Sequence, residues 1–298
     1  VQNSLLDKDE LERELEVIIE EIRQMRDNPM AMVSQSTFKS LYAGTQLGRP
    51  VIGYEEVVKG LTREKVRAYY KRWYSPNNMS FIASGHFVTS DLLKKLEERA
   101  GEFQPLTVPR RARPALLNLS SEPSELMSRI HILSGPYQEA RLNLSVRSAG
   151  IDDAKAAAWD MLSSVLGGSD SSRLSRDVKD ELGIVTSIDS LYYAPRYPCG
   201  VFGIVFYGES ETAHRALKAS LAQLELLSRN GPTREEISRI LSSVQASRIY
   251  ARESVEGIAR SLGQSLFSSH KLNFEEHYVE QLKAVTAADI QKLARDVV

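Results

Sequence analysis

Two glutamates near the start of the chain have the spacing of residues that could act together. Glu14 and Glu21 lie seven residues, or two helical turns, apart in LERELEVIIEEIRQMRDNP, so in a helix both point to nearly the same side. Ile18 lies between them, so the carboxylates border an apolar stripe. Such a pair can hold a divalent cation or shift the protonation of either acid. Spacing alone favours the alternative, a solvated acidic helix face.

The helix that would position this pair is expected over residues 8–27. Asp7 or Asp9 can cap it, and DNP at 27–29 should end it, because the residue before a proline is disfavoured in a helix. A loop-rich stretch should follow, then a helix from Thr62. A short buried strand, MSFIASG, is expected at 79–85, and a helix ending at Gly101 closes this half.

The second half of the sequence mixes strand and helix patterns without a strict alternation, which favours an α+β fold. Strands are expected at about 128–134, 142–148, 184–193 and 200–207. Helices are expected at about 152–168, 171–182, 211–229, 233–252, 255–268 and 274–297, with a break near Thr286.

The composition limits the classes of function. The chain has 38 basic and 39 acidic residues, a net charge of -1, so it has no overall positive field for nucleic acid. The RRAR run at 110–113 is not interleaved with aromatic residues. Cys199 is the only cysteine, which excludes an intrachain disulfide and a Cys-type zinc site. No run of 18 apolar residues predicts a membrane span.

Residues 102–125 contain four prolines and an arginine cluster, a composition typical of a linker. We therefore divide the chain into 1–105, a linker at 106–125, and 126–298. An internal similarity indicates that both halves share one fold, because KGLTREKVRAYYKRWY at 59–74 aligns with KAVTAADIQKLARDVV at 283–298. The first half continues into the expected strand at 79–85, so we expect the second half to lack its last strand.

Three longer segments resemble consecutive landmarks of the pitrilysin/insulinase family of zinc metallopeptidases, the inverted zincins marked by H-x-x-E-H. They are ERELEVIIEEI, GRPVIGYEEVVKGLTREKVRAYYKRWYSPNNMSFIASGHF and GGSDSSRLSRDVKDELGIVTSI, in the family's order. The resemblance implies two homologous domains, each a mostly antiparallel sheet with helices on one face, the first truncated at its N-terminus. It implies that Glu21 is the third zinc ligand and that Glu14 lies near the metal.

The histidine motif itself is absent. None of the five histidines forms H-x-x-E-H or precedes Glu21; they are His86, His131, His214, His270 and His277. We expect all five to be structural. The resemblance implies zinc in the intact protein. Because the histidine motif is absent, neither catalytic zinc nor peptide hydrolysis is expected in this chain.

The resemblance also implies an Arg/Tyr pair that holds substrate opposite the metal. In VKDELGIVTSI the matching positions are Lys179 and Thr186, which lack the planar donor fork and the aromatic ring. Ordinary helix and strand roles remain the alternative for both. Counting forty-one residues back from Thr62 reaches Glu21, and the same count from Thr286 reaches Gln245. A neutral amide is a poor zinc ligand, so the second domain is expected to be metal-dead.

The family resemblance implies a subunit of a zinc endopeptidase of the bacterial two-subunit type, which cleaves peptides or unfolded segments in a chamber formed with a homologous partner, as a heterodimer or a homodimer. The peptide would bind partly as an added edge strand. The alternative is a non-catalytic family member with a structural or peptide-binding role. The compartment stays open between bacterial periplasm and cytoplasm.

Overall fold

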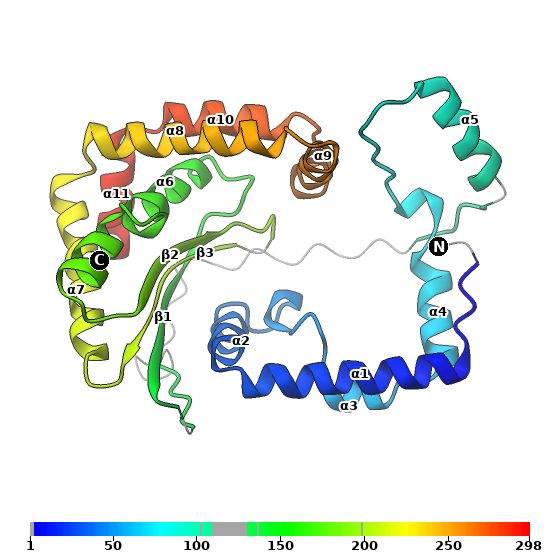
Figure 1. The fold of residues 1–298 in the computed structure, drawn as a ribbon, viewed down its shortest axis with the longest axis horizontal. Helices are drawn as coiled ribbons and strands as arrows, with labels where there is room; N and C mark the ends of the chain where they lie inside the picture. The colour runs from blue at the N-terminus through cyan, green and yellow to red at the C-terminus, as the bar shows by residue number, and fades with distance from the viewer. Residues whose placement is uncertain (1–2, 102, 109–129, 136, 198) are drawn as a thin grey trace.

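The computed structural model describes residues 3–101, 103–108, 130–135, 137–197 and 199–298, and Figure 1 shows two groups of elements in it. The described part of the first half is helical. Its elements are α1 (Lys8–Asp27), α2 (Pro29–Leu41), η1 (Gln46–Gly48), α3 (Glu55–Lys59), α4 (Arg63–Trp73), η2 (Pro76–Asn78) and α5 (Thr89–Ala100). No described helix is long and apolar enough to cross a membrane.

The boundary between α1 and α2 follows from two local caps. The Asp7 carboxylate accepts the backbone N–H groups of Asp9 and Glu10 at the start of α1. Asn28 ends α1, and its side chain accepts the N–H groups of Met30 and Ala31 at 2.9 and 3.3 Å. The prediction that DNP ends the first helix is confirmed. The predicted loop after it is wrong, because Asn is a favourable N-cap and proline fits the first helical turn.

The strand predicted at 79–85 is absent. Residues 79–84 have no regular secondary structure and pair with no strand among the described residues, and Phe81 is 66% exposed. The same holds for 130–134 of the predicted strand at 128–134, whose first two residues lie outside the described ranges. A strand pattern becomes a strand only where a neighbour accepts its backbone hydrogen bonds.

The second half contains a three-stranded antiparallel sheet in the order β1, β3, β2. The predicted strands at 142–148, 184–193 and 200–207 correspond to β1 (Glu139–Ser148), β2 (Ser187–Tyr193) and β3 (Gly200–Glu209). The remaining elements are α6 (Ala156–Gly167), the π-helical segment η4 (Leu174–Glu181), α7 (Ala213–Asn230), α8 (Arg234–Ala251), α9 (Val255–Ser269), α10 (Phe274–Ala284) and α11 (Ala287–Val297). The predicted break near Thr286 is confirmed.

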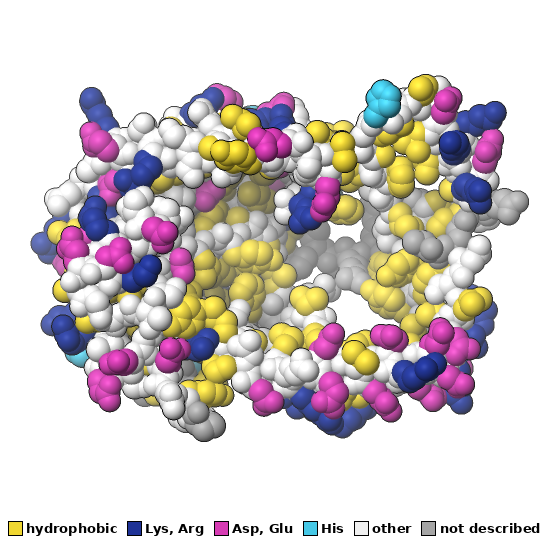
Figure 2. All heavy atoms as spheres, viewed as in Figure 1, with side chains coloured by type: hydrophobic (Ala, Val, Ile, Leu, Met, Phe, Trp, Pro, Cys, Tyr) yellow, Lys and Arg dark blue, Asp and Glu magenta, His cyan; other side chains and the backbone are white. Residues whose placement is uncertain are grey.

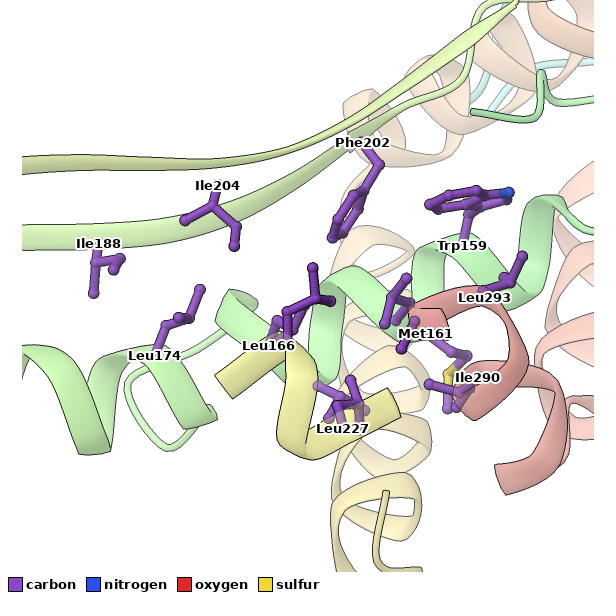
Figure 3. Packing of buried hydrophobic residues seen from close by; sticks show 14 of the residues in the cluster. Trp159, Met161, Leu166, Leu174, Ile188, Phe202, Ile204, Leu227, Ile290 and Leu293 are labelled. Carbon is purple, nitrogen blue, oxygen red and sulfur yellow. The ribbon is translucent and has the colours of Figure 1, made fainter. Parts of the chain in front are cut away.

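One face of this sheet forms the main core. Phe202 and Ile204 of β3 point toward α6, where Met161 and Leu166 are fully buried (Figure 3). Phe206 of the same strand is fully buried in this cluster. Burying each such side chain contributes roughly 1.5 to 3 kcal/mol. α6 approaches β2 closely at Gly167, where a Cβ atom would lie 2.2 Å from the backbone nitrogen of Ser190. The α+β prediction is therefore confirmed, with the sheet confined to the second half of the described chain.

A second, smaller cluster joins the two halves. Tyr42, at the end of α2, is fully buried beside Cys199 and Val201. Its hydroxyl donates a hydrogen bond of 2.8 Å to the backbone oxygen of Cys199, and burial raises the pKa of this phenol. Arg147 of β1 donates to the carbonyl oxygen of Leu41 at 3.1 Å. α2 of the first half thus packs on the second-half sheet. Most of the predicted linker, 109–125, lies outside the described residues.

We predict that Tyr42→Phe lowers the free energy of unfolding by about 1 to 2 kcal/mol, because the Cys199 carbonyl loses its donor in a buried place. Urea unfolding followed by circular dichroism measures this change. Tyr250→Phe, at a position 69% exposed, is the matched control and should be neutral. Equal stability of both variants would contradict the role given to the Tyr42 hydroxyl.

Candidate functional site

Glu14 and Glu21 are both exposed on α1. Their neighbours three and four positions away include no cation, and both share Val17 and Ile18. Two other acids of α1 are paired, since Glu12 lies 3.9 Å from Lys8 and Glu20 lies 2.6 Å from Arg23. Glu14 and Glu21 form no ion pair with any residue that the structure describes. Figure 2 shows acidic side chains along this helix.

The apolar side of α1 is only partly covered. Ile22 is 4% exposed, but Val17 is 52% exposed and Ile18 is half-buried. The predicted arrangement, two carboxylates beside an apolar stripe, is therefore present on the helix. The stripe remains available for a further packing partner around Val17 and Ile18.

A cluster of cations around Glu55 ties α3 to α1. The Glu55 carboxylate lies 3.1 Å from Arg23, 2.8 Å from Arg26 and 2.8 Å from Lys59. Hydrogen bonds from Lys59 and Arg23 lower the pKa of Glu55 to about 2. Both arginines of α1 that follow Glu21 are therefore engaged with Glu55. Sequence reasoning missed this cluster; its only local signal was the Glu55 and Lys59 spacing of four residues.

The histidines do not complete a metal site. His131 lies 2.8 Å from the Ser40 hydroxyl, and His270 ends α9 in a left-handed conformation, with φ of 58°. Within the described ranges no three His, Cys, Asp or Glu side chains gather in a way that could hold a metal ion. The described residues therefore do not by themselves fit a catalytic zinc ion, for which Glu21 could supply one carboxylate.

Lys179 and Thr186 flank the passage from η4 to β2. The Lys179 ammonium lies 4.0 Å from the Asp170 carboxylate. The Thr186 side chain is exposed, and its backbone N–H donates to the Tyr207 carbonyl at 2.7 Å. Gly183 turns the chain between them with φ of 61°, a conformation that favours glycine. The structure gives no contact between this passage and Glu14 or Glu21.

The residue count from the predicted repeat leads to α8, which packs on α6. Gln245, the residue reached by counting, is exposed on α8. The two helices can also be aligned by their apolar stripes, so that Ile240 and Val244 correspond to Ile18 and Ile22. In this alignment Ser243 takes the position of Glu21. Either register puts a neutral side chain there.

A nearly buried ion pair fixes the segment that leads into η4. Arg173 and Glu236 form two parallel hydrogen bonds of 2.7 and 2.8 Å, with side chains only 11% and 10% exposed. Glu236 also accepts the backbone N–H of Thr233 at 2.7 Å in a capping box. Burial raises the pKa of Glu236, but the hydrogen bonds from Arg173 and Thr233 outweigh it and hold the pKa below its ordinary value. The T-x-x-E spacing of Thr233 and Glu236 is the sequence pattern that predicts this capping box.

The antiparallel sheet, with α6 packed on one face and α2 on the other, defines an α+β protein. The sequence profile of the family described as "Peptidase M16 inactive domain" matches residues 60–244. The chain belongs to the peptidase M16 family, which confirms the pitrilysin/insulinase resemblance.

Individual relatives agree with this assignment. A Streptomyces coelicolor protein named an uncharacterized zinc protease is 24% identical over 294 residues, covering 99% of this chain and 64% of that protein. A Mycobacterium tuberculosis protein with the same description is 25% identical over 297 residues, covering 99% and 66%. The chain thus spans less than two thirds of these relatives. The crystal structure of a protease from Helicobacter pylori shares the fold, with a TM-score of 0.83 at 19% identity, covering 97% of this chain and 70% of that one.

We predict that Arg173→Ala lowers the free energy of unfolding by about 3 kcal/mol, because it leaves the Glu236 carboxylate nearly buried without its cation. Arg176→Ala is the matched control, since Arg176 is 55% exposed and pairs with its neighbour Asp177. This control should cost less than about 1 kcal/mol. Denaturant unfolding at neutral pH compares the two, and equal losses would contradict the assignment.

Acid should weaken the ion cluster around Glu55. Because the pKa of Glu55 is about 2 in the folded chain and 4.5 without its partners, its stabilising effect is complete above pH 4.5 and is lost as pH falls toward 2. Glu55→Gln should therefore flatten the fall of melting temperature between pH 4.5 and 2. Glu56→Gln, an exposed neighbour on α3, should keep the steeper wild-type slope. Parallel curves for all three proteins would refute the role of the cluster.

Proposed function

We propose that this chain is the part of a zinc-dependent M16 endopeptidase that carries the carboxylate metal ligand, Glu21. The observation that carries the proposal is the state of α1, where Glu14 and Glu21 lie exposed together beside an apolar patch and pair with no described cation. Membership of the M16 family supports it, and so do the names of relatives that are called zinc proteases.

Zinc held by such a site acidifies a bound water and polarises a peptide carbonyl. Within this chain, Glu21 would bind the metal through a carboxylate oxygen. Glu14, two turns earlier, would accept a hydrogen bond from a group around the metal and orient it. The two histidine ligands and a general base would come from an H-x-x-E-H segment of the longer gene product, because no such motif occurs in residues 1–298.

The substrate in this proposal is a peptide or unfolded segment bound between subunits. In the space-filling view an opening lies between the second-half elements and α4, and hydrophobic side chains gather around it (Figure 2). In a chamber formed with a homologous partner, Lys179 and Thr186 would stand where the family has its substrate-binding Arg/Tyr pair. Because these two side chains are poor replacements, the partner subunit would supply that pair.

The second candidate is a non-catalytic M16 subunit. The observation that favours it is the family match itself, whose description is that of an inactive domain and whose residues 60–244 exclude Glu14 and Glu21. In that case the chain would bind peptides or build an assembly, and Glu21 would have no metal to bind.

We predict that the full-length gene product, purified with its partner, contains about one zinc per subunit and hydrolyses a denatured protein substrate. Glu21→Gln should remove zinc and activity, because an amide is a weak replacement for a carboxylate ligand. Glu14→Gln should weaken zinc binding about 10- to 100-fold. Elemental analysis and a fluorogenic peptide assay measure both effects.

The matched control is Glu12→Gln, since Glu12 is an acid of the same helix that pairs with Lys8. It should leave zinc content and hydrolysis unchanged. A wild-type protein without zinc would exclude the peptidase and leave the non-catalytic candidate. Full zinc occupancy in Glu21→Gln would show that another residue is the ligand.

A further inference from the structure

The N-terminal end of α1 is joined to α4 through one side chain. Arg63, half-buried in the first turn of α4, donates from its Nε to the Leu6 carbonyl and from its Nη2 to the Leu5 carbonyl, the latter bond at 3.2 Å. Figure 1 shows the segment before α1 running beside α4. One guanidinium therefore binds two consecutive carbonyl groups just ahead of Asp7, the residue that caps α1.

The backbone at Leu6 is strained. Its φ is 47°, in the left-handed region that is uncommon for residues other than glycine. Such a conformation persists only where the surrounding structure fixes it, and it occurs most often at functional sites and clamps. The two Arg63 hydrogen bonds and the Asp7 cap are the contacts that fix it in this chain.

Little else holds this end of the helix. Residues 8–21 include no buried residue, and their apolar side chains Leu11 and Leu15 are only half-buried. Within the described ranges, no other hydrogen bond or ion pair joins residues 3–19 to another element, since Lys8 and Glu12 pair within α1. The direction of the first turns of α1 therefore depends on Arg63.

The opposite end of α1 is held independently. Ile22 is 4% exposed, and two arginines that follow it bind Glu55 of α3 at 3.1 and 2.8 Å. Glu21 directly precedes this second anchor. Glu14 lies in the other part of the helix, about 10 Å along the axis from the cap residue. Its direction is therefore the one that the Arg63 anchor controls.

We propose that Arg63 is a positioning residue for the carboxylate pair of α1. By binding the Leu5 and Leu6 carbonyls it fixes the first turns of the helix, and so the side to which Glu14 points relative to Glu21. Arg63 acts through the backbone ahead of the helix, because neither carboxylate pairs with a described cation. The inference rests on the proposed function only for the use made of the carboxylates; the anchor itself requires no metal.

Amide hydrogen exchange of this chain, read without metal, tests the anchor. In Arg63→Ala the amides of residues 11–17 should exchange about tenfold faster than in the wild type, because the first turns of α1 open locally without their anchor. Residues 22–27 should keep wild-type exchange, since Ile22 and Glu55 still hold them. Arg63→Lys should lie between the two, because an ammonium lacks the planar fork that binds two carbonyls together.

Arg67→Ala is the matched control, since Arg67 is exposed one turn further along α4. It should leave the exchange of α1 unchanged. Wild-type exchange at residues 11–17 in Arg63→Ala, or an equal rise at residues 22–27 in both Arg63 variants, would overturn the proposal.

Zinc binding by the full-length gene product separates positioning from a general loss of structure. Arg63→Ala should weaken zinc binding no more than Glu14→Gln does. Added to Glu14→Gln it should weaken binding no further, because both changes act through one carboxylate. Additive losses in the double variant would contradict the positioning role. A wild-type product without zinc would end the proposed function, and exchange would then decide by itself whether Arg63 anchors α1.

Discussion

Burial of apolar side chains between one sheet face and α6 is the interaction on which the rest of the structure depends. Phe202, Ile204 and Phe206 close the core of the second half against α6, α7 and α11. The first half has no apolar cluster of this size among the described residues, and no residue of α4 is fully buried. Its helices are held by the Tyr42 hydrogen bond to Cys199 and by the ions around Glu55. Surface ion pairs stabilise far less than a core, so most of the stabilising burial lies in the second half.

The family match and the proposed metal ligands lie in different parts of the chain. The M16 match over 60–244 begins before α4, covers the sheet and α6, and establishes the family. Glu14 and Glu21 lie outside that match, on α1. The metal proposal therefore depends on α1 itself, where two acids beside Val17 and Ile18 have no described cation to neutralise them. Gln245 and Ser243 of α8 are neutral, so neither offers a carboxylate to a metal ion.

Local signals in the sequence were enough to predict most helices. Thr62, Thr233 and Thr286 start helices through side-chain caps that involve only the next three residues. Asn28 shows the limit, because the same DNP that ends α1 also starts α2. The strand pattern at 79–85 could not be judged locally, since it needs a partner strand. The Tyr42 bond joins residues 157 positions apart, and Glu55 meets Arg23 and Arg26 across 32 and 29 positions. No spacing rule predicts such contacts.

The central claim is that Glu21 is a metal ligand. A crystal structure of the zinc-loaded full-length gene product, with anomalous scattering recorded at the zinc edge, tests it most directly. The account predicts an anomalous peak with a Glu21 carboxylate oxygen at about 2.0 to 2.2 Å and two histidine nitrogens from the H-x-x-E-H segment. A zinc peak remote from Glu21, or a crystal soaked in zinc that shows no peak beside α1, would contradict it.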